Sequence, residues 1–330
     1  MGRGDGLLWS TATTRGGRRW PLLVLGAFFW AAWSPTLSAG ELEVLFKAPW
    51  GSGPGQVGML PADESSPEGP MAFAVDAAGD IWVLDQVNRR VVVLTPEGKV
   101  VEEITLARET YHDLVLGASG EMILLDRYGT PGVEVVQGGE VMARAPVVGE
   151  GIDFAGGVTA LFLDADGVYA EYAHLSLLQV MDAHYQEVET RRRLGGRPSV
   201  DGKWLWTAQL AGRKGVQLWS TDRGRDVLQE ERIIAFDRWV WQIVALEPMP
   251  QGQVLLVVHQ IEEEPETFTV VWERYLGLVL DRDLVELWRF ETQPSAGALE
   301  QFRAFTVDAH GAIYQSRFDA QGMEIRRWTR

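Results

Sequence analysis

Apolar and polar positions alternate along most of the chain after residue 40, in short runs separated by glycine-containing turns. Alternation with a period of two predicts half-buried β-strands, because successive side chains of a strand point to opposite faces. Runs with the 3.6-residue period of a helix are almost absent, and β-branched and aromatic residues are frequent in the alternating segments. The pattern therefore predicts an all-β protein.

One unit recurs six times: an apolar strand, a polar turn with glycine, and a second apolar strand. The copies span residues 73–85, 114–126, 160–172, 198–208, 245–258 and 304–316, with turn glycines Gly79, Gly120, Gly167, Gly202, Gly252 and Gly311. Their spacing averages roughly 40 to 50 residues, which is typical of a four-stranded propeller blade. Third and fourth strands can be read after most copies, including residues 186–193 after the third. We therefore expect a six-bladed β-propeller of antiparallel blades.

The last copy leaves room for only three strands before Arg330, whereas residues 41–50 form a strand without a partner. We expect this N-terminal strand to complete the sixth blade and close the ring. Residues 41–330 are then a single propeller domain, which is expected to be monomeric.

The first 40 residues have the order of a secretory signal peptide: arginines, an apolar run at 21–33, and a tail of small residues. We expect cleavage near residue 40. A retained anchor is the alternative, although the apolar run falls short of the roughly 20 residues that span a bilayer. Arg18 and Arg19 also fit twin-arginine export, but Pro21 favours ordinary secretion.

The chain contains no cysteine, which excludes disulfides, thiolate metal sites and a cysteine nucleophile. An exported protein without disulfides fits a bacterial envelope, so a periplasmic or secreted location is expected. Without residues 1–40, the 30 basic and 46 acidic residues become 26 and 45, a net charge of −19. Such a surface disfavours nucleic acid and anionic membranes as partners, and no membrane span is expected after cleavage.

Residues 69–101 (GPMAFAVDAAGDIWVLDQVNRRVVVLTPEGKVV) resemble the NHL-repeat family of propellers. The resemblance rests on the proline before the inner strand, the V-D-x-x-G turn, Asp85 at the end of the second strand, and Asn88 with the arginines that follow. It implies a propeller fold.

Asp76, Asp80 and Asp85 are of the residue type that binds calcium. However, Asp76 and Asp85 lie at opposite ends of a strand, on the order of 15 Å apart at about 3.3 Å per residue, so they cannot share an ion. Aspartate commonly accepts hydrogen bonds from its own turn. We therefore interpret Asp76 as a turn residue.

Propeller geometry places the connections between blades, and the loops between second and third strands, on one face around the channel mouth. Arg197 and His174 belong to this rim, and residues 259–268 are expected to form a solvated loop there. The residues predicted to bind a ligand or partner on this rim are Tyr111, His112, Asp113, Arg238, Trp239 and Arg303.

No sequence signature of catalysis is present, so we expect a non-enzymatic binding or scaffolding module without a cofactor. Its expected partner is a protein or peptide of the bacterial cell envelope. The alternative is a metal-dependent propeller hydrolase or lyase, similar to lactonases or peptidyl-amidating lyases. That enzyme would hold calcium or zinc in the channel, with candidate ligands His112, Asp113 and His259.

Overall fold

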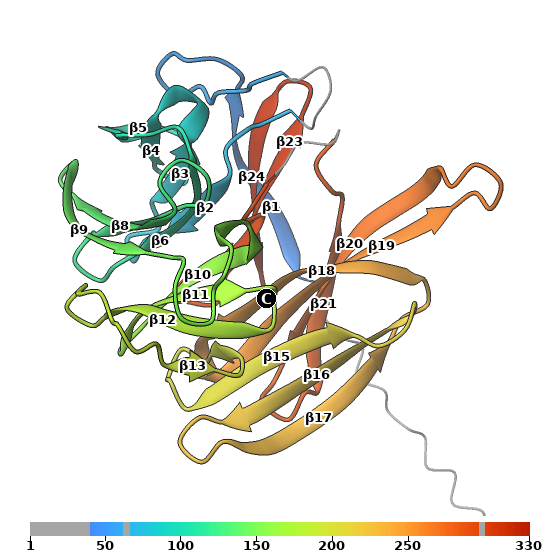
Figure 1. Cartoon of the computed structure of the whole chain (residues 1–330). Coiled ribbons are helices and arrows are strands. Elements are labelled where there is room, and N and C mark those ends of the chain that lie inside the picture. The colour runs from blue at the N-terminus through green and yellow to red at the C-terminus, as the bar shows by residue number, and fades with distance from the viewer. Residues whose placement is uncertain (1–39, 62–66, 297–300) are drawn as a thin grey trace, which may run out of the picture. The chain divides into compact units, whose positions relative to one another are not determined.

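The computed structural model describes residues 40–61, 67–296 and 301–330. It contains six four-stranded antiparallel sheets arranged in a ring, each sheet forming one blade (Figure 1). The predicted fold, a six-bladed β-propeller, is therefore confirmed. The expected signal peptide, apart from Gly40, lies outside the described residues.

Within each blade, the strands are given in order from the channel outward. Strand numbers follow the order of the whole chain. Blade 1 holds β2 (Ala72–Val75), β3 (Ile81–Asp85), β4 (Arg90–Leu94) and β5 (Val100–Thr105). Blade 2 holds β6 (Tyr111–Leu116), β7 (Met122–Asp126), β8 (Gly132–Gln137) and β9 (Glu140–Pro146). Blade 3 holds β10 (Val158–Asp164), β11 (Gly167–Tyr172), β12 (Ser176–Asp182) and β13 (Arg193–Leu194).

The second half of the chain continues this order. Blade 4 holds β14 (Arg197–Pro198), β15 (Trp204–Leu210), β16 (Gly215–Asp222) and β17 (Val227–Ala235). Blade 5 holds β18 (Trp239–Met249), β19 (Gln253–Glu263), β20 (Val270–Leu280) and β21 (Glu286–Thr292). Blade 6 holds β22 (Phe305–Val307), β23 (Ile313–Asp319), β24 (Gly322–Thr329) and β1 (Glu41–Pro49).

Helical structure in the described parts of the chain is limited to three short 3₁₀ turns: η1 (Gln86–Asn88), η2 (Ala155–Gly157) and η3 (Pro250–Gly252). The structure shows no helix there that is long and apolar enough to cross a membrane.

β1 closes the ring, as predicted from the sequence. It pairs antiparallel with β24, from Glu41 opposite Thr329 to Pro49 opposite Gly322. Phe46 of β1 packs in the hydrophobic cluster between blades 6 and 1. The N-terminal strand therefore joins the two ends of the propeller by both hydrogen bonds and core packing.

The core consists of hydrophobic clusters wedged between neighbouring blades. The cluster between blades 3 and 4 is the smallest and contains Ala160, Phe162, Tyr169, Leu177, Leu194 and Leu205. Its small size follows from β13 and β14, which have only two residues each. This seam also carries ion pairs between the blades, which join Arg197 to Glu171 and Arg223 to Asp164.

The Asp76 carboxylate caps the first hairpin turn, as interpreted from the sequence. Its Oδ1 accepts hydrogen bonds from the N–H groups of Ala78 at 2.8 Å and Asp80 at 3.0 Å, and its Oδ2 accepts one from the Trp82 indole at 2.9 Å. Gly79 has a φ of +90°, a conformation that favours glycine. The turn chemistry accounts for this aspartate without a metal ion.

Asp85 has a different structural role, at the end of β3. Its buried carboxylate accepts hydrogen bonds from Gly58 N–H at 2.8 Å, the Asn88 amide at 2.8 Å and Arg90 Nε at 2.9 Å. Arg90 in turn donates to backbone carbonyls of the glycine-rich loop at residues 51–58, including that of Gln56 at 2.9 Å. The side chains that carry the NHL resemblance thus fix this loop against blade 1.

Two sequence predictions, one of a strand and one of a loop, are wrong. The expected strand at 186–193 is reduced to β13, because its run of charged residues offers no apolar face to the neighbouring blade. The expected loop at 259–268 is strand as far as Glu263, and the ladder between β19 and β20 continues to Glu263 opposite Val270. Figure 1 shows the resulting hairpin extending outward from blade 5. Alternating cross-strand pairs, such as His259 opposite Tyr275, keep this hairpin paired.

Candidate functional site

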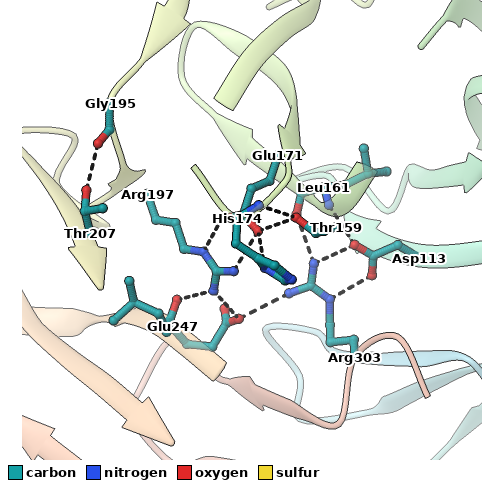
Figure 2. Close-up of polar contacts among 11 residues, drawn as sticks. Asp113, Thr159, Leu161, Glu171, His174, Gly195, Arg197, Thr207, Glu247 and Arg303 are labelled. Atoms are coloured by element: carbon teal, nitrogen blue, oxygen red, sulfur yellow. Dashed lines mark hydrogen bonds and ion pairs between the residues drawn. The ribbon is translucent and has the colours of Figure 1, made fainter. Parts of the chain in front are cut away.

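Five charged side chains from five different blades meet inside the channel and point toward one another (Figure 2). We call this group the channel network; it consists of Asp113 of blade 2, Glu171 of blade 3, Arg197 of blade 4, Glu247 of blade 5 and Arg303, which precedes blade 6. All except Glu171 lie on an innermost strand or directly before one. The innermost strands line the channel of a propeller, so the fold itself brings these distant residues together.

Arg303 and Asp113 form a bidentate ion pair. Arg303 Nε and Nη2 each donate to one Asp113 oxygen at 2.8 Å, and Nη2 also donates to the Leu161 carbonyl at 2.9 Å. Asp113 Oδ2 accepts a further bond from Leu161 N–H at 2.7 Å. Burial lowers the pKa of Arg303, but the adjacent Asp113 carboxylate outweighs this effect and raises it. Arg303 therefore keeps its positive charge, and its contacts with Asp113 and Leu161 join blades 2, 3 and 6.

Arg197 and Glu171 form the second bidentate pair, with Nε–Oε1 and Nη2–Oε2 distances of 2.8 and 2.9 Å. Arg197 Nη1 donates to the Leu246 carbonyl at 2.6 Å, and Thr159 Oγ1 donates to Glu171 at 2.8 Å. Burial tends to raise the pKa of Glu171, but Arg197 and these hydrogen bonds outweigh burial and hold it far below its usual range. Glu171 is therefore ionised at neutral pH, and these hydrogen bonds hold its carboxylate in place.

Glu247 is held less tightly. Its Oε1 lies 3.5 Å from Arg197 Nη1 and 3.6 Å from Arg303 Nη1, longer than the contacts within either bidentate pair. Burial raises the pKa of Glu247 above its ordinary value, because the two arginines compensate only part of the cost of desolvation. Three carboxylates in the network thus share two guanidinium groups.

A cavity of about 350 Å³, which we call the recess, opens at one mouth of the channel. Its floor includes Arg197, Glu247 and Arg303 of the channel network. Its walls come from blades 3, 4 and 5 and combine apolar and amide side chains, among them Leu175, Trp206, Gln209, Gln242 and Ile243. His174, in the loop between β11 and β12, places the recess on the face predicted from the sequence to bind.

A wider cavity of about 1020 Å³ occupies the opposite mouth, among the turns between first and second strands. Asp76, Asp164 and Ala309 are among its lining residues. Glu247 and Arg303 line both cavities, so the channel network separates the two mouths.

The structure brings only some of the predicted rim residues together. Asp113 and Arg303 are in contact, within the channel network. Tyr111, by contrast, is buried in the cluster between blades 1 and 2, and its hydroxyl donates to Glu134. The expectation that Tyr111 lies on the rim is therefore wrong, because β6 begins at this residue and turns its side chain into the core.

His112 lies behind the recess rather than in it. Its ring packs edge-on against Tyr128, with centroids 4.9 Å apart, and against Phe302 at 6.2 Å. Phe302 lines the recess, and the Arg127 guanidinium lies 5.1 Å from its ring centroid. His112 therefore supports the recess wall through aromatic contacts.

Arg238 and Trp239 belong to a separate group at the start of β18, beside the extended hairpin of blade 5. Trp239 packs edge-on against Trp241 at 5.4 Å, while Arg238 lies over the Trp272 ring at 4.3 Å and pairs with Glu262. These cation–π and aromatic contacts stiffen an exposed edge of the rim. Neither Arg238 nor Trp239 lines the recess.

The three candidate metal ligands of the alternative function do not form one site. Asp113 is engaged by Arg303, and His112 packs against Tyr128. His259 Nε2 lies 2.8 Å from Glu273 Oε2, and burial lowers the pKa of His259 despite this carboxylate. Within the ranges that the structure describes, no group of three or more histidine, aspartate and glutamate side chains could hold a metal ion.

Two members of the site, Glu171 and Glu247, were not predicted from the sequence. Each is a glutamate within an otherwise apolar strand, in the segments VYAEY and ALEPM. A charged residue at such a position needs a buried partner, and this is the signal that could have identified both.

No protein-family model matches the sequence, and no curated protein matches it. Solved structures with a similar fold include hydrazine synthase of Kuenenia stuttgartiensis, with 14% identity, 74% of this chain and 72% of that chain covered, and a TM-score of 0.49. Virginiamycin B lyase of Staphylococcus aureus is 10% identical, with 88% and 99% covered and a TM-score of 0.49. A streptogramin B lyase is 12% identical, with 88% and 97% covered and a TM-score of 0.45. The similarity concerns the propeller fold alone, and the NHL resemblance stays a resemblance.

Proposed function

We propose that this protein is an exported, non-enzymatic propeller that binds a protein or peptide of the bacterial cell envelope at the recess. The observation that supports this proposal is a recess with largely apolar walls above a floor of paired charges. A volume of about 350 Å³ is at the lower end of ligand pockets and fits one side chain or a short segment. Leu175 and Leu210, which are 66% and 46% exposed, extend the apolar surface outward from the recess.

The state of two of the three carboxylates, Glu171 and Asp113, also favours binding over acid–base catalysis. A general acid or base is most effective when its pKa lies near the working pH. Arg197 holds the pKa of Glu171 far below that range, and the Asp113 carboxylate forms a bidentate pair with Arg303. These groups therefore fix the geometry of the channel floor.

We expect Ala208→Trp to block ligand binding, because Ala208 lines the recess and an indole there would occupy its volume. Peptides enriched from a displayed random library on the wild-type protein should bind the variant at least about tenfold more weakly, as loss of a buried side-chain contact implies. Titration calorimetry with the enriched peptides measures the change.

Ala309→Trp is the matched control, since it places the same side chain in the cavity at the opposite mouth. Equal affinity of the enriched peptides for the wild type and Ala208→Trp, or a loss confined to Ala309→Trp, would contradict binding at the recess. Far-ultraviolet circular dichroism and thermal melting of both variants show that the fold is retained.

A further inference from the structure

The charges at the floor of the recess are unequal in number, and this inequality indicates the kind of ligand that the proposed binding site takes. Both arginines direct their donors to protein acceptors. Arg197 donates to Glu171 and to the Leu246 carbonyl, and Arg303 donates to Asp113 and to the Leu161 carbonyl. An anionic ligand would therefore have to displace existing ion pairs.

Glu247 is the third carboxylate, and it is only partly compensated. Both of its arginine contacts, at 3.5 and 3.6 Å, are made by Oε1. Within residues 40–61, 67–296 and 301–330, no hydrogen bond to Oε2 is found. The Glu247 side chain is 14% exposed and lines the recess, so a donor that enters the channel can reach this carboxylate.

We propose that the recess binds a basic side chain of the partner, with its cationic end at Glu247 and its aliphatic stem along the apolar wall. This inference rests on the proposed function, since it names the chemistry of the ligand bound at the same site. A lysine side chain matches both parts of the recess, because it combines an apolar stem with a compact charge. Ile243, Leu175 and Leu210 supply the wall for the stem.

Charge balance supports a cation here more than any other ligand. A bound ammonium would give three positive groups to three carboxylates, so that Glu247 would no longer have to share the two guanidinium groups that Asp113 and Glu171 already engage. Charge-assisted hydrogen bonds to a partly buried carboxylate are among the stronger polar contacts in proteins. The excess of acidic residues over the whole chain, 46 against 30 basic, also attracts basic partners.

The pH dependence of stability follows from the same carboxylate. Glu247 faces Arg197 and Arg303, the carboxylates of Asp113 and Glu171, and His174 beside Glu171. Burial raises the pKa of Glu247 in the folded state, so the folded protein binds this proton more tightly than the unfolded chain does. Without ligand, this group's contribution to stability is present below the unfolded-state pKa and is lost as the pH rises through the folded-state pKa.

Glu247→Gln tests the inference, because it removes the charge and keeps the shape. The probes are three tripeptides with blocked ends, Gly-Lys-Gly, Gly-norleucine-Gly and Gly-Glu-Gly, titrated into the full propeller at neutral pH. We expect the wild type to bind the lysine peptide at least about tenfold more tightly than the norleucine peptide, and the Glu247→Gln variant to lose that preference. The lysine peptide should also raise the melting temperature of the wild type more at pH 8 than at pH 5.

Glu262→Gln is the matched control, because Glu262 is an exposed glutamate on the hairpin, outside the recess. Equal binding of the lysine and norleucine peptides, with both lost in Ala208→Trp, would overturn the inference and leave the proposed function intact. An equal loss of the lysine preference in Glu262→Gln and Glu247→Gln would assign it to the general surface charge and overturn the inference as well. Lysine-peptide binding that Ala208→Trp leaves unchanged would overturn both.

Discussion

Replacing Arg303 with methionine is expected to lower the free energy of unfolding by about 3–5 kcal/mol, because it removes one partner of a buried ion pair and leaves the other charge uncompensated. Asp113 is fully buried and would lose both of its bonds from the guanidinium, while Glu247 would lose one of its two cations. Denaturant unfolding followed by tryptophan fluorescence measures the change.

A double variant separates this charge effect from a packing effect. Adding Asp113→Asn to the Arg303 variant removes the unpaired charge and keeps an acceptor for Leu161 N–H, so part of the lost stability should return. Arg225→Met is the control, because the Arg225 side chain is 80% exposed and its loss should cost less than about 0.5 kcal/mol. Similar losses in the Arg303 and Arg225 variants would contradict a structural role for the channel network.

Asp85→Ala is expected to destabilise the propeller by about 3 kcal/mol or more, because it leaves the Arg90 guanidinium without its buried carboxylate. The Arg90 side chain is only 10% exposed, and Gly58 N–H and Asn88 would lose an acceptor at the same time. Loop 51–58 should exchange its amide hydrogens faster, which hydrogen-exchange mass spectrometry would detect alongside the drop in melting temperature.

Asp76→Ala provides the comparison for Asp85, since Asp76 bonds to a solvent-facing turn where water can replace the carboxylate. We expect a loss of about 1 kcal/mol there. A larger loss at Asp76 than at Asp85 would refute the distinction drawn between the turn aspartate and the loop-binding aspartate.

The number of blades could be predicted from the sequence because its signals are local. Alternating apolar residues and a turn glycine such as Gly79 or Gly311 define each hairpin within a short segment, and the spare strand at 41–50 shows how the ring closes. The strand boundaries that depend on the neighbouring blade could not be predicted in this way. For example, β19 continues to Glu263 because its residues pair with those of β20, although the local run of glutamates is typical of a loop.

The channel network could be predicted only in part, for the same physical reason. Asp113 and Arg303 were placed on the rim from their positions before or at inner strands, but 190 positions separate them, and no local pattern shows that they pair. Glu171 comes from a second strand and Glu247 from the middle of an inner one. Both meet Arg197 only because the ring brings blades 3, 4 and 5 around a common axis.

The closure by β1 also determines the order of events when the protein folds. Glu43 and Arg327, which form an ion pair across β1 and β24, are 284 positions apart. Closing a loop of that length costs about 5 kcal/mol of chain entropy, so this contact cannot form early. During synthesis, β1 has no partner until the final strand emerges. We therefore expect sealing of the ring to be a late folding step, and a chain stopped before β24 to retain an open sheet edge that is prone to aggregation.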